Sequence, residues 1–293
     1  MQKNRNVIIK SRIWDREVSR AVIDSTAMVN EAISRHALSH VAAAALGRAM
    51  TATVYLCSWL KEEQSALSVT LNGDGAGGKI CVSGDGALNM RGFVQNPHVE
   101  LAPRRDGKLD VGGFVGKNGT LSVIRDDGEG LPFSGMSQLI SGEIAQDFSA
   151  YFLTSEQRPT AIALGVKIAK DGSCLGSGGV FLQPLPFAKE ENIDRAAREI
   201  EKYSSLSTLI AESGISPILE AFGAKELQER EFSYRCRCSR TRAEDAVLAL
   251  GKQEAYDAVR ELGKISVHCD YCNTDYLIDE RRLDELFEGG ERR

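Results

Sequence analysis

The 293-residue chain is long enough for one large or two modest domains, and its 42% hydrophobic and 26% charged residues are typical of a folded globular protein. This composition excludes a disordered or fibrous protein, and no apolar run approaches the roughly 18 uncharged residues of a membrane helix. The net charge of −5 disfavours general nucleic-acid binding, which needs a basic excess to displace phosphate counterions.

The N-terminal residues and the cysteine count indicate a cytoplasmic protein. The first ten residues include basic side chains, but no long apolar core or small-residue cleavage site of a signal peptide follows them. The seven cysteines are an odd number, which fits poorly with a secreted scaffold in which every cysteine is paired.

The spacing of apolar residues in the first half of the chain changes near residue 60. From Asp15 to about Leu60, apolar residues recur near helical spacing, which predicts one long helix or two, broken near Gly47. From Leu67 to Gln183, short Val/Ile/Leu runs alternate with Gly-Asp and Asn-Gly turns, which predicts a mostly antiparallel sheet. The clearest strand and hairpin signals are the strand after Gly116-Lys-Asn-Gly and the strand before Lys170-Asp-Gly-Ser.

The sequence pattern of the second half of the chain predicts a linker and a small C-terminal domain. Prolines close the sheet region, and a helical pattern from Ile193 to Leu227 is interrupted by Gly214 and Pro217. We therefore expect an α+β protein in three parts: an N-terminal domain with a mostly antiparallel sheet and packed helices, a helical linker, and a zinc-binding domain. The expected bounds are 1–183, 184–231 and 232–293.

Four of the seven cysteines cluster in the last segment, as Cys236-Arg-Cys238 and Cys269-Asp-Tyr-Cys272. Two close pairs of thiolates are the donor set of a closed tetrahedral zinc site, so we predict one zinc ion per chain on these four residues. A segment of about 60 residues is marginal by core burial alone, and structural zinc contributes on the order of 10 kcal/mol to its folding. Loss of the metal should therefore unfold it. His268 is expected to be a neighbour that tunes the thiolates.

Two other functions are compatible with clustered cysteines. A thioredoxin-like oxidoreductase would place C-x-x-C at the start of a helix, whereas the residues around Cys269 and Cys272 are typical of a zinc-knuckle turn. A nucleic-acid-binding zinc module would need a basic surface, but residues 232–293 hold 11 Lys or Arg and 13 Asp or Glu. The basic run Arg235, Arg237, Arg240 and Arg242 either favours thiolate over thiol or is a solvated charged face.

Zinc-bound thiolates also have oxidation chemistry available. An oxidant converts them to sulfenates and then to disulfides, after which the metal has no ligands. Proximity in the sequence predicts that Cys236 pairs with Cys238 and Cys269 with Cys272. The three remaining cysteines stand alone and are expected to have no role: Cys57, Cys81 and Cys174.

Three further motifs have simpler explanations. Gly73-Asp-Gly-Ala-Gly-Gly78 matches a dinucleotide fingerprint, but the residues that follow predict a strand and not a helix. His36 and His40 are spaced like zinc-protease ligands on the expected long helix but lack the catalytic glutamate. Asn118-Gly-Thr is a formal glycosylation sequon that we interpret as a hairpin turn.

The whole chain resembles the 33 kDa redox-regulated heat-shock chaperone family. Beyond the cysteines, the resemblance depends on segments spread along the sequence: Arg91–Pro97, Gly116–Val123, Ser141–Ala145, Tyr151–Pro159 and Gly178–Pro186. One departure is Ala76, where the family is expected to have proline, and it should affect only a turn.

The resemblance implies a molecular chaperone that is not an enzyme. It implies an ATP-independent holdase that binds unfolding proteins and prevents their aggregation under oxidative stress. The reduced, zinc-bound form would be inactive, and oxidation to two disulfides with release of zinc would activate it. The implied partners are unfolded or oxidatively damaged client proteins and, in the active form, a second copy of the chain; neither nucleic acid nor a membrane is expected.

Overall fold

The chain divides between Arg235 and Cys236 into two units, Met1–Arg235 and Cys236–Arg293. The computed structural model describes residues 5–223 and 226–288. The expected α+β class with antiparallel sheets is confirmed, and the helices expected in the linker belong to the first unit. Among the described helices, none combines the length and apolar character that crossing a membrane requires. The three-part division with bounds at 183 and 231 stays a prediction.

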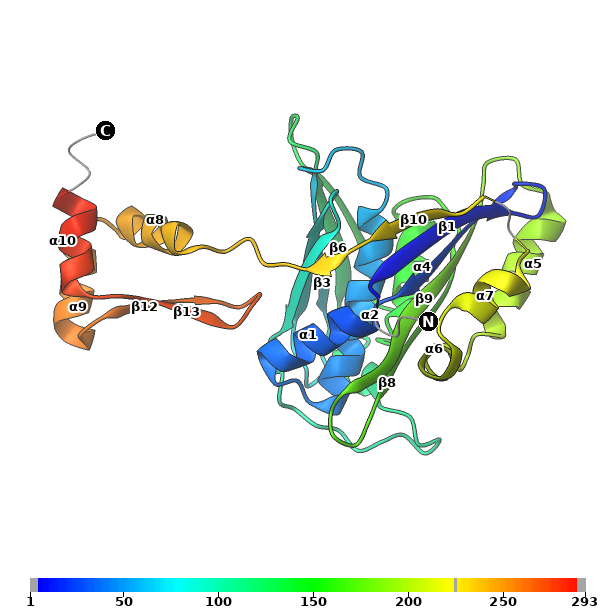
Figure 1. Ribbon diagram of the computed structural model, residues 1–293, viewed down its shortest axis with the longest axis horizontal. Coiled ribbons are helices and arrows are strands. Elements are labelled where there is room, and N and C mark those ends of the chain that lie inside the picture. Colours follow the sequence, from blue (N-terminus) through cyan, green and yellow to red (C-terminus); the bar gives the residue numbers. More distant parts are fainter. Residues whose placement is uncertain (1–4, 224–225, 289–293) are drawn as a thin grey trace. The chain divides into compact units, whose positions relative to one another are not determined.

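The first sheet brings together strands from both ends of the first unit (Figure 1). Its order is β10-β1-β2-β9-β8, and every pairing in it is antiparallel. The strands are β1 (Val7–Ile13), β2 (Val18–Asp24), β8 (Ala161–Ile168), β9 (Cys174–Pro184) and β10 (Gln228–Glu231). Strand β10 was not expected: residues 228–231 lie within the expected linker but beyond its helical pattern, and they extend the edge of β1.

The second sheet has the order β11-β5-β4-β3-β6-β7. Its strands are β3 (Ala66–Asn72), β4 (Ile80–Asp85), β5 (Asn89–Val94), β6 (Thr120–Asp126), β7 (Phe133–Gln138) and β11 (Ser233–Tyr234). The short strand β11 pairs with β5 in parallel, and the other pairings are antiparallel. The segment 116–119 does not form the expected hairpin, because it leads from α3 (Val111–Val115) into β6.

Helix α2 (His40–Cys57) forms the centre of the first unit, where it contacts strands of both sheets (Figure 1). Every residue from Val41 to Cys57 except Arg48 is buried. Such a helix has no solvent-exposed face, which explains its continuous run of small and apolar residues. The helix begins where the hydroxyl of Ser39 accepts a hydrogen bond from the backbone N–H of Ala42, 3.2 Å away.

The expectation for residues 15–60 was wrong in two respects. Residues 18–24 form strand β2, because their β-branched residues pair between β1 and β9. The helices are α1 (Thr26–His36) and α2, and the break lies at Ala37, whose φ of 48° is left-handed. Gly47 lies inside α2 and does not interrupt it. A side chain at this position would crowd α1, because a Cβ there would lie 2.9 Å from Cγ2 of Val29. The glycine therefore permits a close approach of the two helices.

Three short helices cover the outer face of the first sheet, opposite α2 (Figure 1). They are α5 (Glu190–Glu201), α6 (Leu206–Ser213) and α7 (Ser216–Ala221), and we call them the linker helices. Gly214 ends α6, and Pro217 lies in the first turn of α7, where proline is tolerated. One buried cluster joins the sheet and the linker helices: Val7, Ile9, Ile13, Val18, Val22, Val180 and Leu182 with Ala196, Tyr203, Leu206, Ile210, Ile215 and Ile218.

The second unit is small and has its own core. It contains α8 (Arg240–Leu250), α9 (Lys252–Leu262), α10 (Glu280–Glu288) and the hairpin of β12 (Ile265–Cys269) and β13 (Thr274–Ile278). Its core cluster consists of five buried residues, Val247, Ala255, Val259, Ile278 and Leu283. Leu250 and Leu262, the last residues of α8 and α9, lie outside this core and are 48% and 70% exposed. So small a core leaves the second unit dependent on further links between its segments.

Candidate metal centre

An irregular segment and a turn of the second unit present the four clustered cysteines. Cys236 and Cys238 lie in the segment without regular secondary structure that ends at Ser239, whose hydroxyl accepts a hydrogen bond from the N–H of Arg242 at the start of α8. Cys269 is the last residue of β12, and Cys272 lies in the turn to β13. In this turn the backbone N–H groups of Cys272 and Asn273 both donate to the carbonyl of Cys269, at 3.2 and 2.8 Å.

The four sulfur atoms converge. All four Sγ atoms lie within 4.8 Å of one another, with 3.7 Å between Cys236 and Cys269 and 3.2 Å between Cys238 and Cys272. A tetrahedral ion with metal–sulfur distances of about 2.3 Å separates its ligands by about 3.8 Å. The sulfurs are therefore spaced as a four-thiolate metal site requires, and the soft donor set suits a metal that favours sulfur.

Polar side chains on β13 contact the sulfurs. The hydroxyl of Tyr276 donates a hydrogen bond to Sγ of Cys238 at 3.1 Å, and Oγ1 of Thr274 lies 3.3 Å from Sγ of Cys272. The sequence reasoning missed both residues. The signal was available, because residues 274 and 276 follow Cys272 at the alternate positions that share one face of a strand.

The thiols of the cluster differ in acidity. Partial burial alone would raise the pKa of Cys238, but hydrogen bonds from Tyr276 and from the other thiols outweigh it and lower this pKa to about 7. Burial, followed by hydrogen bonds within the cluster, raises the pKa of Cys269, and burial raises that of Cys272. The hydrogen bond to Cys238 raises the pKa of Tyr276 to about 12. Of Cys238, Cys269 and Cys272, Cys238 is therefore the thiol that forms a thiolate most readily.

The charged residues near the cysteines form a structural network. Arg240 donates to Glu244 at 3.1 Å, and Arg282 binds both carboxylate oxygens of Glu244 at 2.9 Å. Glu244 is buried, and its ion pairs tie α8 to α10. The guanidinium of Arg240 is thus directed to a carboxylate. The sequence analysis did not identify Glu244, because a buried acid on a charged helix has no local signature.

His268 lies on β12, next to Cys269, but outside the sulfur cluster. Its Nδ1 lies 2.9 Å from Oδ1 of Asp275, and its Nε2 lies 3.9 Å from Asp270. Within the described ranges 5–223 and 226–288, no other group of three or more His, Cys, Asp or Glu side chains lies close enough to share one ion.

The other motifs have structural roles in the first unit. Residues 73–78 connect β3 to β4, so the prediction of a following strand is confirmed. His36 and His40 lie on different helices and contact the Tyr234 hydroxyl and Glu100, so their assignment to one helix was wrong. The side chain of Asn118 donates to Asp74 at 2.6 Å.

The fold and the site define the class: a domain of two mostly antiparallel sheets, followed by a separate small unit whose four clustered cysteines could hold a metal ion. Comparison with known proteins gives the family. The family model described as "Hsp33 protein" matches residues 6–279. A protein named 33 kDa chaperonin from Bacillus cytotoxicus is 37% identical over 290 residues, covering 97% of this chain and 99% of that protein.

Further matches agree with this result. A 33 kDa chaperonin from Thermoanaerobacter sp. is 36% identical over 287 residues, covering 96% of this chain and 98% of its own. The crystal structure of the 33 kDa chaperonin (heat shock protein 33 homolog) from Thermotoga maritima superposes with a TM-score of 0.90 at 34% identity, covering 99% of this chain and 100% of that one. The chain belongs to the Hsp33 family of chaperones, which confirms the resemblance found in the sequence.

Proposed function

We propose that this protein is a redox-regulated, ATP-independent holdase of the cytoplasm. In this proposal, Cys236, Cys238, Cys269 and Cys272 hold one zinc ion in the reduced, inactive form. Oxidation forms disulfides between Cys236 and Cys238 and between Cys269 and Cys272. The zinc ion is then released, and the protein becomes an active chaperone. The observation that carries the proposal is the convergence of four sulfurs in a unit with a very small core.

The chemistry of the site supports zinc as the metal. When bound, zinc would supply no redox chemistry; it would link the segment before α8 to the turn between β12 and β13 and add folding free energy on the order of 10 kcal/mol. The four sulfurs come from segments on either side of α8 and α9, so the link closes this helical pair. The buried apolar residues of the second unit are few, so without this link we expect it to unfold.

The oxidation step needs a peroxide or another two-electron oxidant. One thiolate attacks a peroxide oxygen, the O–O bond breaks, and the sulfur becomes a sulfenic acid with release of hydroxide. A second thiolate displaces hydroxide from that sulfur and forms the S–S bond. Each disulfide consumes one peroxide, so two peroxides oxidise the site. All four Sγ atoms lie within 4.8 Å, so the geometry allows any pairing, and proximity in the sequence supports the proposed one.

The second step of the proposal exposes apolar surface in the first unit. Cys236 follows directly on β11 and β10, two short strands with mostly exposed residues. These strands continue from the linker helices, which cover the apolar face of the first sheet. We expect the loss of order that begins at Cys236 to spread through β11 and β10 to the linker helices. The uncovered sheet face then binds apolar segments of unfolding clients.

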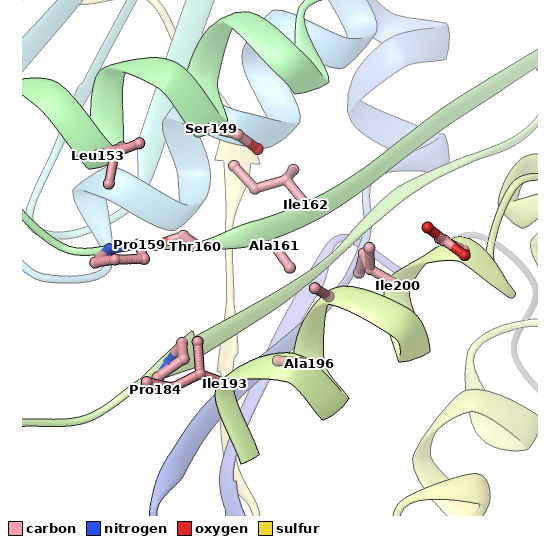
Figure 2. Close-up of a pocket in the computed structure, with 12 residues that line it drawn as sticks. Ser149, Leu153, Pro159, Thr160, Ala161, Ile162, Pro184, Ile193, Ala196 and Ile200 are labelled. Carbon is pink, nitrogen blue, oxygen red and sulfur yellow. The ribbon is translucent and has the colours of Figure 1, made fainter. Parts of the chain in front are cut away.

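The linker helices also leave part of the surface accessible. A cavity of about 390 Å³ lies between α5, α4 (Ala145–Thr154) and the adjoining ends of β8 and β9. Figure 2 shows that Leu153 of α4 and Ile193 and Ile200 of α5 line it. This cavity is open to solvent, so α5 lacks packing contacts with α4 on that side, which supports a displaceable linker.

An aggregation assay tests this proposal. The reduced, zinc-loaded protein should not suppress aggregation of a heat-unfolded client, whereas the protein treated with peroxide and heat should suppress it without ATP. Peptide mapping should find the two proposed disulfides, and size analysis should find a dimer. A variant with all four clustered cysteines replaced by serine should bind no zinc and show no oxidant response, whereas one with Cys57, Cys81 and Cys174 replaced by serine should respond normally. Equal suppression by the reduced and oxidised protein would contradict the proposal.

A further inference from the structure

An arginine lies buried beneath the last linker helix. Arg20, on β2, is 0% exposed, and its Nη1 donates to the carbonyl of Leu219 in α7 at 3.2 Å. Its guanidinium also lies over the ring of Phe222, 5.2 Å from the ring centre. Its Nε and Nη2 atoms are buried and have no hydrogen-bond partner within the described residues. No ion pair to Arg20 is found in residues 5–223 and 226–288, so its charge is not neutralised there.

A second polar group accompanies it on the neighbouring strand. Ser11 of β1 is the cross-strand partner of Arg20, and directly paired residues share one face of a sheet. Ser11 is 7% exposed, and its Oγ also has no hydrogen-bond partner in the described part of the chain. Three polar atoms without partners therefore lie together on a face that is otherwise lined by Val, Ile and Leu.

Such groups make docking of α7 less favourable. In water all N–H groups of the guanidinium have hydrogen-bond partners, and docking of α7 removes this water without replacing all of them. Burial lowers the pKa of Arg20 to about 10, because removing the guanidinium from water disfavours its charged form. The contacts with Leu219 and Phe222 offset part of the penalty. Replacing a buried, incompletely partnered charge with an apolar residue of similar size stabilises many proteins.

We propose that Arg20 beneath α7, with Ser11 beside it on the same face of the sheet, forms a built-in polar defect that keeps the linker helices weakly docked in the reduced protein. The proposal rests on the proposed function for its meaning, because weak docking is useful only if linker release activates the chaperone. The defect makes the docked state easy to leave when the zinc-bound unit loses order. Its effect on docking is nevertheless measurable without oxidant or client.

The test is hydrogen–deuterium exchange of the reduced, zinc-loaded full chain, followed in the peptide that covers α6 and α7. Arg20→Met keeps the length of the side chain and removes the charge. We expect the α7 amides of this variant to exchange about tenfold more slowly than those of the wild type. Ser11→Ala should slow exchange by a smaller factor. The matched control is Arg12→Met, which removes an exposed arginine from the same hairpin and should leave exchange within about twofold of the wild type.

The results separate this proposal from the proposed function. Unchanged or faster exchange in Arg20→Met would overturn the polar defect; if that variant does not fold, unchanged or faster exchange in Ser11→Ala overturns it instead. The oxidative activation of Arg20→Met is then measured separately. Slower exchange with delayed activation supports both proposals. Slower exchange with unaltered activation supports the polar-defect proposal but contradicts linker release as the activating step.

Discussion

The hydroxyl of Tyr276 donates a hydrogen bond to Sγ of Cys238, with 3.1 Å between the oxygen and the sulfur. The contact joins β13 to the segment before α8, and so it connects the two pairs of cysteines through a side chain that is not itself a ligand. Residues that orient metal ligands in this way commonly alter metal affinity when they are removed. Tyr276 is therefore the residue whose loss should disturb the site without removing a sulfur.

Substitution Tyr276→Phe should weaken zinc binding by about tenfold, because the thiolate of Cys238 loses its hydrogen-bond donor. Competition with a coloured zinc chelator measures the affinity. Tyr256→Phe is the matched control, since the Tyr256 hydroxyl donates to Asp284 at 2.6 Å and not to a sulfur. If both variants bind zinc as the wild type does, the hydroxyl of Tyr276 has no part in metal binding.

A single methyl group at Gly176 should release the linker without oxidation. A Cβ at this position would lie 2.5 Å from the carbonyl oxygen of Ser207 and 2.6 Å from the backbone N of Ala211, both in α6. Backbone atoms cannot move aside as a side-chain tip can, so α6 must leave the sheet. We expect Gly176→Ala to suppress client aggregation in the reduced state.

Leu175→Ala provides the control, because Leu175 lies on the same strand and is 49% exposed. It should remain inactive until it is oxidised. A reduced Gly176→Ala protein that is inactive while its α6 amides exchange freely would separate linker release from chaperone activity.

The partly buried Lys10 should give the first unit a specific pH dependence. Burial, followed by the charge of Arg230, lowers the pKa of Lys10 to about 8. The folded chain therefore holds this proton more weakly than the unfolded chain. The free energy of unfolding should rise, by up to about 3 kcal/mol, as the pH increases from about 8 towards the ordinary lysine value near 10.4.

Urea unfolding of wild type and Lys10→Met at several pH values tests this expectation. Tryptophan fluorescence reports the first unit, since both tryptophans of the chain, Trp14 and Trp59, lie in it. The stability advantage of Lys10→Met at pH 7 should shrink as the pH rises. A parallel pH dependence in the two proteins would contradict the account, and the exposed Lys61→Met should follow the wild type.

The two buried cysteines of the first unit, Cys57 and Cys174, should resist oxidation. Burial raises the pKa of Cys57 and raises that of Cys174 to about 12, and both side chains are buried. Neither thiol forms the reactive thiolate readily. Alkylation of the native protein at pH 8, after zinc removal, should label the clustered cysteines well before these two, as mass spectrometry can measure. Equally fast labelling of Cys57 would show that the first unit opens as well.

The cysteine pairs were predictable from the sequence because metal ligation leaves a local signature, two close Cys pairs, and the structure brings all four sulfurs together. The sheet region was predictable from its turns and short apolar runs. Strand β2 was not, because Val18 and Val22 fit helical spacing as well as strand spacing, and only pairing with β1 and β9 decides between them. The polar contacts of Arg20 and Glu244 arise between segments distant in sequence, so no local pattern indicates them.

The central claim is that four thiolates and one metal keep the second unit folded until oxidation removes the metal. Zinc content and amide exchange of residues 236–287, measured on the same samples before and after peroxide, test it most directly. We predict one zinc per chain and slow exchange in the reduced protein, and no zinc and rapid exchange after oxidation. A reduced protein that is metal-free yet protected from exchange, or an oxidised protein that loses zinc and stays protected, would contradict the account.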